Sequence, residues 1–168
     1  MKSKASKQQL YALLWDLPKG GDMHNHFGLS NVPEQWYTAA TNKKRTDGNE
    51  FFTRTRFNNR PDSVEPFLRF RNIQRSTYLK LPDCRKDEYQ SLAALSQDLK
   101  AEWLSALIID KDAEGRNEFF DVIVPRVGEL ARDPWLATDL LVENMRRYAA
   151  QGLRSPETQM VITNYQDR

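Results

Sequence analysis

The sequence predicts an α/β protein that is mostly helical, in which one strand is followed by several helices and then by a second, parallel strand. The first strand pattern, Asp22–Phe27, follows a Gly-Gly turn, and the second, Glu157–Thr163, follows a well-capped helix. A strand, helices and a parallel strand in this order begin a βαβ arrangement. Because parallel strands are covered on both faces, two strands among so many helices indicate part of a larger α/β unit.

The N-terminal third alternates short elements with breaks. Ser6–Asp16 has leucines at helical spacing, and Leu17–Gly21, with a proline and two glycines, ends that helix before the first strand. Val32–Thr41 predicts a second, brief helix. Residues 42–62 are polar, basic and rich in asparagine, arginine and threonine. We expect an irregular surface insertion there.

The middle of the sequence predicts further helices. Ser63–Leu79 has aromatic and aliphatic residues at near-helical spacing, and Glu88–Ile109 repeats leucine and tryptophan with a helical period. A turn region that contains a proline, Leu81–Asp87, separates them. A charged loop is expected at Lys111–Arg116. These helices would form a long helical insertion between the two strands.

The C-terminal part contains the clearest helix signals. Glu118–Leu130 is a helix candidate. The helix after it has Asp133 as its N-cap, Pro134 at its first position and Gly152 just past its end. The segment that follows, Glu157–Thr163, is rich in β-forming residues and is predicted to be the second strand.

Size and cysteine content narrow the class of protein. The 168 residues suffice for one domain with a core but not for a complete (β/α)₈ barrel, which takes about 250 residues. The net charge of +2 indicates no particular partner. Cys84 is the only cysteine, so the sequence allows neither an intrachain disulfide nor a cysteine-based zinc site.

The sequence also bears on localisation and macromolecular partners. No apolar stretch approaches the roughly 20 residues of a membrane span, and no signal peptide is recognisable. We expect a cytoplasmic protein without a membrane partner, although a sequence that lacked an upstream secretion signal would look the same. Basic residues interleave with phenylalanines between residues 43 and 60, as in single-stranded nucleic-acid binders. The acids among them and the near-neutral net charge favour a solvated surface, so we expect no nucleic-acid partner and leave the oligomeric state open.

The two histidines of the chain, His24 and His26, are the candidate metal ligands. Residues i and i+2 of a strand point to the same side, so both imidazoles can approach one point. Two neutral imidazoles suit zinc, and also iron, nickel or manganese. The alternative is that these are two histidines near a surface turn that have this spacing by chance and bind no metal. Their position at a strand end favours the functional interpretation, because barrel enzymes place their chemistry there.

The residues around this pair resemble the opening of metal-dependent adenosine deaminases. Leu17–His26 reads L-P-K-G-G-D-M-H-N-H. It is most similar to the adenosine deaminase growth factor branch and its bacterial relatives, which read L-P-K-G-G-x-L-H-x-H at this place. A looser likeness covers Asn117–Asp121, the helix from Asp133 to Gly152, and Glu157–Gln159, which resemble that branch's approach to its second barrel strand.

The resemblance implies a (β/α)₈ barrel with one catalytic metal, usually zinc, of which this chain is the N-terminal part with strands one and two. His24 and His26 would be the paired metal ligands, and Glu157 falls where the branch has a glutamate near the sugar. In the family, metal-bound water attacks C6 of adenosine or a related purine nucleoside, and ammonia leaves. Its remaining ligands and its general acid come from later strands, and this sequence has no third histidine. We therefore expect the catalytic residues outside this chain, and the isolated chain to be inactive.

The turn after the histidines departs from the family. The family has Leu-Asp-Gly, Leu-Ser-Gly or a direct aspartate, whose polar side chain meets the ribose, whereas this chain has Phe27-Gly28-Leu29-Ser30. Two alternatives therefore stay open: a non-catalytic relic or interaction module of the same ancestry, and another H-x-H amidohydrolase acting on a different amine or amide. Deaminases with the H-x-E and P-C-x-x-C signature are excluded, because neither motif occurs.

Overall fold

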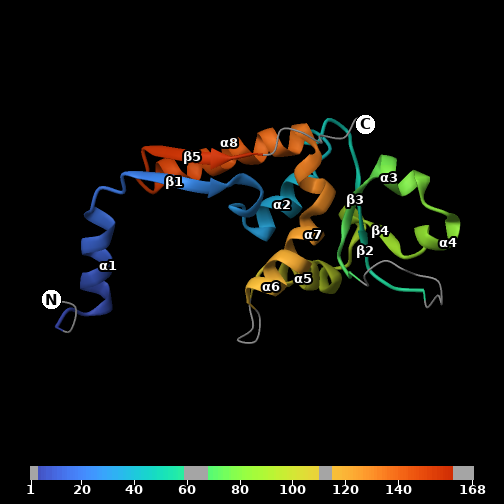
Figure 1. Ribbon diagram of the computed structural model, residues 1–168, viewed down its shortest axis with the longest axis horizontal. Coiled ribbons are helices and arrows are strands. Elements are labelled where there is room, and N and C mark those ends of the chain that lie inside the picture. Colours follow the sequence, from blue (N-terminus) through green and yellow to red (C-terminus); the bar gives the residue numbers. More distant parts are fainter. Residues whose placement is uncertain (1–3, 59–67, 110–114, 161–168) are drawn as a thin grey trace.

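The computed structural model contains two small sheets at opposite ends of an elongated molecule (Figure 1). One is a parallel pair of β1 (Gly21–His26) and β5 (Ser155–Gln159), with the long helix α8 (Pro134–Ala150) alongside. The mixed fold and the parallel pairing of the first and last strands confirm the α/β prediction at this coarse level. The other sheet is antiparallel, with the order β3 (Asn72–Gln74), β2 (Phe51–Arg54), β4 (Tyr89–Ser91).

The structure describes residues 4–58, 68–109 and 115–160. No helix in this part of the chain has both the length and the apolar character needed to cross a membrane. Besides α8, the helical segments are α1 (Lys7–Asp16), η1 (Phe27–Leu29), α2 (Pro33–Ala40), α3 (Arg75–Lys80), α4 (Asp83–Lys86), η2 (Leu92–Ala94), α5 (Gln97–Ser105), α6 (Arg116–Glu118), η3 (Phe119–Ile123), α7 (Val124–Val127) and η4 (Gly128–Arg132).

The predicted helix boundaries near the two ends of the chain are confirmed, and so is the predicted N-cap Asp133. The Ser6 hydroxyl accepts the Gln9 amide N–H at 3.2 Å, and the Gln9 side chain accepts the Ser6 amide N–H at 2.9 Å, which completes a capping box. The Asp133 carboxylate accepts the Leu136 amide N–H at 2.9 Å at the start of α8. Gly152 has φ +82°, the left-handed conformation that ends many helices.

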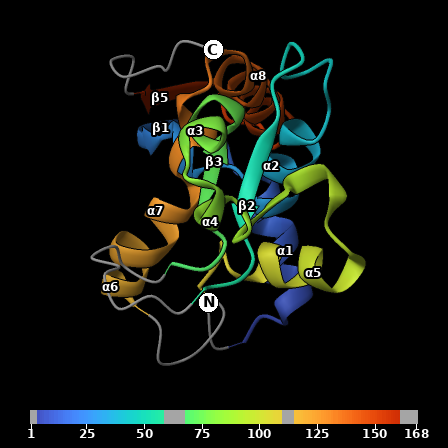
Figure 2. The same ribbon diagram turned by 90° about the vertical axis from the view of Figure 1, so that its right-hand side faces the viewer.

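The expectation of an irregular surface insertion at residues 42–62 is wrong for Phe51–Arg54, which form β2, whereas residues 42–50 and 55–58 contain no helix or strand. β2 is the central strand of the antiparallel sheet, and Figure 2, viewed from that end, shows it beside β3. Phe51 and Thr53 are buried. The polar composition misled because this strand also buries Arg54, whose charge is paired across the sheet. Residues 59–62 lie outside the described residues.

Two predicted helices are wrong in part. In Ser63–Leu79, the described residues before α3 include β3, and residues 63–67 lie outside the described part. In Glu88–Ile109, the first residues form β4, and α5 begins only after its cap, Ser96. Strands of three residues are too short to show alternation, and their pairing with the distant β2 overrides local propensity.

Two further predictions differ from the structure only in detail. The turn region Leu81–Asp87 contains one helical turn, α4, and β5 covers the described part of the predicted second strand. Residues 111–114 of the expected charged loop and residues 161–163 of the predicted strand lie outside the described residues.

The predicted helix Glu118–Leu130 is helical but irregular. It runs through α6, a π-helical stretch η3, α7 and the 3₁₀ segment η4. The Val124 amide N–H donates to the Phe119 carbonyl, five residues back. Pro125 explains the wider turn, since it has no N–H to donate and its ring displaces the carbonyl four residues earlier. Such π-helical turns are frequent at functional sites, and this one lines the groove described below.

The hydrophobic core lies between α2, α5, η4 and α8. Its fully buried members include Trp36, Trp103, Leu130, Leu136 and Leu140. By contrast, α1 has no buried side chain and projects away from the rest of the molecule in Figure 1. The described chain therefore folds around the helices between the two sheets rather than around its N-terminal helix.

A buried ion pair holds the antiparallel sheet together. A guanidinium nitrogen of Arg54, on β2, lies 2.6 Å from a carboxylate oxygen of Glu88, and both side chains are only 2% exposed. Glu88 also accepts the Asn58 amide N–H at 3.0 Å, and Arg85 lies 3.7 Å from it. Because neither charge is solvated, removing one partner leaves the other buried and uncompensated.

We expect Glu88→Gln to lower the free energy of unfolding by about 3 kcal/mol, because the Arg54 charge loses its counterion inside the protein. Urea denaturation followed by circular dichroism measures this loss. The matched control is Glu102→Gln, which removes the exposed pair between Glu102 and Arg69, where the glutamate side chain is 48% exposed. The control should cost less than about 1 kcal/mol. Equal losses in the two variants would contradict the prediction.

Candidate metal centre

The parallel pair of β1 and β5 contains the two histidines, which lie at the carboxyl end of β1. Gly21 pairs with Ser155, Asn25 with Thr158, and His26 with Gln159. The register shifts between Asp22 and Asn25, so β1 has one residue more than β5 in that interval. The strands approach each other closely at Gly21, where a Cβ would lie 2.8 Å from the Ser155 carbonyl oxygen.

Asn25 is the buried residue of β1, and its side chain faces α8 and β5. It donates to the Tyr148 hydroxyl of α8, and the Thr158 hydroxyl of β5 lies 3.3 Å from its side-chain oxygen. Because strand residues alternate between faces, His24 and His26 project to the opposite, open face. Both histidines are exposed.

The two imidazoles lie against each other on that open face. Their Nε2 atoms are 3.1 Å apart and their ring centroids 5.0 Å apart, with the ring planes inclined at 60°. At this separation one neutral ring can donate its N–H to the nitrogen of the other. The prediction that i and i+2 bring the two rings to one point is therefore confirmed.

The same geometry fits two adjacent ligands of one metal ion. With zinc–nitrogen bonds of about 2.0–2.1 Å, two nitrogens lie about 3.4 Å apart at a tetrahedral angle and about 2.9 Å apart at a right angle. The observed 3.1 Å falls between these values. Among the residues that the structure describes, no three His, Cys, Asp or Glu side chains are grouped closely enough to hold a metal. The two histidines are thus suited to half of a metal site.

Glu157 and Ser30, the two further residues considered for nucleoside contact, are placed differently. Glu157 is exposed on β5, in the interval opposite Met23 and His24, and it is not part of the groove lining. The Ser30 hydroxyl lies 2.8 Å from the Asn25 side-chain oxygen and 2.9 Å from the His26 carbonyl oxygen. Its single proton is used within the turn, so Ser30 stabilises the end of β1.

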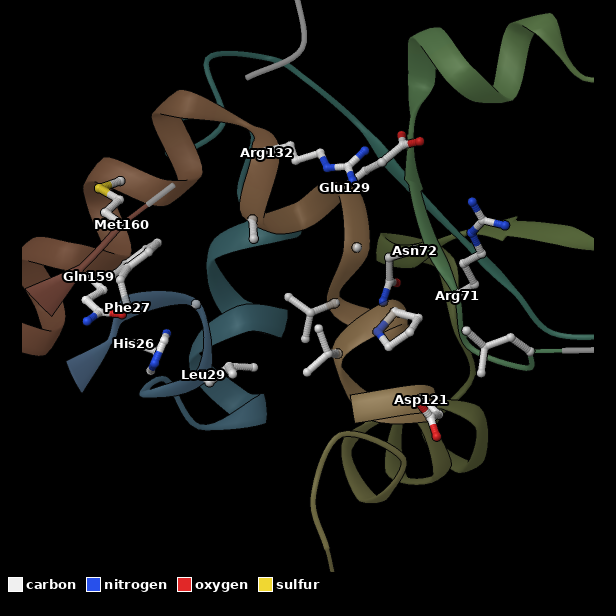
Figure 3. A pocket seen from close by; sticks show the side chains of 17 residues that line it. His26, Phe27, Leu29, Arg71, Asn72, Asp121, Glu129, Arg132, Gln159 and Met160 are labelled. Carbon is white, nitrogen blue, oxygen red and sulfur yellow. The ribbon is translucent and has the colours of Figure 1, made fainter. Parts of the chain in front are cut away.

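A groove of about 650 Å³ opens beside the carboxyl ends of the two strands (Figure 3). The final strand residues, His26 and Gln159, lie next to each other at one side of it, together with Phe27. The other walls come from η1, from the irregular helix η3–α7–η4 and from β3. Apolar side chains form most of the lining, and its polar members away from the strand ends are Arg71, Asn72, Asp121, Glu129 and Arg132.

Sequence reasoning missed these groove residues and also the hydrogen-bonding role of Asn25. The groove is closed by segments far apart in the sequence, so no local spacing indicates it. For Asn25 a signal was present, because an asparagine between two outward-facing histidines must face the protein interior, where its amide needs partners.

Comparison with known proteins returned no match: no protein family, no curated protein and no solved structure matches this chain. The interpretation of the site therefore rests on its own geometry and chemistry.

The close approach of the strands at Gly21 gives a test of the β1–β5 pairing. We expect Gly21→Ala to lower the free energy of unfolding by about 1–3 kcal/mol, because its Cβ forces the strands apart. Gly28→Ala is the matched control, since a Cβ there would meet only the Ala131 Cβ at an ordinary 3.9 Å. Urea denaturation of both variants measures the difference, and a Gly21→Ala protein as stable as Gly28→Ala would show that the strands do not pair as described.

Proposed function

We propose that this chain carries the first-strand half of the metal site of an adenosine-deaminase-like hydrolase, with zinc as the metal and a purine nucleoside as the substrate. The observation that carries the proposal is the 3.1 Å separation of the His24 and His26 Nε2 atoms on the open face of a parallel strand pair. The likeness of Leu17–His26 to the opening of those deaminases supplies the reaction class.

The position of the histidines supports a catalytic rather than a purely structural role. They stand at the carboxyl end of a parallel strand, the end at which α/β enzymes bind their ligands. The adjoining groove of about 650 Å³ lies within the range of small-molecule sites, and His26 lines it. Metal and substrate would therefore meet at one place.

The residues of this chain would hold and orient rather than complete the reaction. A divalent metal bound by histidines lowers the pKa of water and so supplies a nucleophile near neutral pH. His24 and His26 would hold that metal, and the apolar wall that includes Phe27 and Leu29 would limit access of bulk water to the groove. Among the described residues, no third His, Cys, Asp or Glu is grouped with this pair, so the further ligands and the group that protonates the leaving amine would come from elsewhere.

A different substrate for the same metal chemistry is the second candidate. Phe27 and Leu29 make the wall apolar where the related deaminases place a polar contact to ribose, and the Ser30 hydroxyl is engaged within the turn. Both observations favour an H-x-H amidohydrolase that acts on a less polar amine or amide. Comparing binding of adenosine with binding of apolar amides separates the two candidates.

Metal binding is the direct test. We expect the chain to bind one zinc ion weakly, and we expect His24→Ala and His26→Ala each to weaken it at least ten-fold, because a lone imidazole remains. Isothermal titration with zinc chloride measures this. Met23→Ala, a change at a 78% exposed neighbour on the same strand, is the control and should bind zinc as the unaltered chain does. Zinc binding that is indifferent to both histidine substitutions would refute the proposal.

Catalysis gives a second test. Because the described residues group only two candidate metal ligands, we expect no ammonia release from adenosine by the purified chain in the presence of zinc. A coupled assay for ammonia, with an intact adenosine deaminase as positive control, measures it. Sustained turnover by this chain alone would show that it contains a complete active site and that its assignment as a half-site is wrong.

A further inference from the structure

We infer that Asn25 is a positioning residue whose buried amide holds His24 and His26 in ligating geometry. The inference rests on the proposed function for the identity of the metal, but the hydrogen bonds that orient Asn25 are present without a metal. Asn25 lies between the histidines in sequence and is 8% exposed, whereas both histidines are exposed. Of these three residues, Asn25 is the one that anchors this end of β1 to the rest of the protein.

The amide nitrogen of Asn25 has two acceptors. It donates to the Asp22 carboxylate at 3.2 Å and to the Tyr148 hydroxyl of α8. Asp22 in turn accepts the backbone N–H of His24 at 3.2 Å. The two protons of the amide therefore connect α8 to the segment that carries the first histidine.

The amide oxygen of Asn25 has two donors on other elements. The Ser30 hydroxyl, just after η1, lies 2.8 Å from it, and the Thr158 hydroxyl of β5 lies 3.3 Å from it. The Ser30 hydroxyl is also 2.9 Å from the His26 carbonyl oxygen, so its one proton is shared between the Asn25 amide and the backbone of the second histidine. An amide has two protons to donate and an oxygen with two lone pairs, and all four have a partner here.

These four contacts fix the orientation of the strand. If Asn25 turned outward, its amide would leave four partners. The partly buried Tyr148 hydroxyl would lose this contact, and the Thr158 hydroxyl would keep only its contact of 3.3 Å with the Asn25 backbone carbonyl. Since neighbouring strand residues alternate, holding Asn25 inward holds both imidazoles outward. Outer residues that orient metal-ligating histidines in this way typically change metal affinity by 10–100-fold when they are replaced.

Another buried asparagine shows that burial alone does not explain the contacts of Asn25. Asn144 of α8 is 1% exposed, yet neither of its side-chain polar atoms has a hydrogen-bond partner. It lies on the helix that also carries Tyr148. Asn144→Leu therefore makes the same chemical change in the same part of the core without removing a hydrogen bond.

The experiment compares Asn25→Leu with Asn144→Leu and adds Tyr148→Phe, a milder change that removes one acceptor of the Asn25 amide. In zinc-free protein labelled with ¹³C and ¹⁵N, we expect nuclear Overhauser contacts between the two imidazole rings in the unaltered chain and in Asn144→Leu. We expect these contacts to be lost in Asn25→Leu and weakened in Tyr148→Phe. Circular dichroism confirms that each variant is folded, and Tyr148→Phe keeps the test decisive if Asn25→Leu does not fold.

Zinc titration of the same proteins separates this inference from the proposed function. We expect Asn25→Leu to bind zinc at least ten-fold more weakly than Asn144→Leu. The inference is overturned, whatever the zinc affinity, if the ring contacts persist in folded Asn25→Leu or are absent from the unaltered chain. If Asn25→Leu does not fold, unchanged ring contacts in Tyr148→Phe overturn it. Ring contacts that depend on Asn25 in a chain that binds no zinc support the positioning role and refute only the metal.

Discussion

The inward orientation of the Asn25 amide decides where the two imidazoles point. An asparagine in a strand can face either solvent or protein, and its amide must find partners in either place. Here the partners come from α8, from β5 and from the turn after β1, so three separate elements set the orientation of one side chain. His24 and His26 need no contacts with the core of their own, because the alternation of the strand places them.

A second set of polar contacts brings the antiparallel sheet against the irregular helix and so forms the far wall of the groove. Glu129 of η4 is buried, and its carboxylate accepts the Gln74 amide N–H at 2.7 Å and the Thr77 hydroxyl at 3.1 Å. Asn72 of β3 accepts the indole N–H of Trp103 at 3.0 Å. Because these bonds join residues 31 to 55 positions apart, the shape of the groove depends on tertiary pairing rather than on local sequence.

Features set by local interactions could be predicted from the sequence, whereas features set by long-range pairing could not. Caps, breaks and the i, i+2 spacing act within a few residues, so the ends of α1 and α8 and the common face of the histidines were predictable. The antiparallel sheet was not predictable, because its strands are three or four residues long and combine polar with apolar side chains. Arg54 illustrates the difficulty, since an arginine indicates surface unless its partner, here Glu88, is known. Long-range pairing of this kind leaves no local period in the sequence.

The open face of the strand pair connects packing with chemistry. The Asn25 side chain contacts Tyr148 of α8 and Thr158 of β5, whereas His24 and His26 are exposed. Parallel sheets in proteins are covered on both faces, and a catalytic zinc takes three protein ligands and a water molecule. Among the described residues, no third ligand is grouped with the histidines, and both of them are exposed. A segment or partner that covered this face would bring further ligands to the proposed metal, and that metal would in turn strengthen the packing, because binding energy at such a site is also folding energy. Covering the strand pair and binding a metal would therefore stabilise each other.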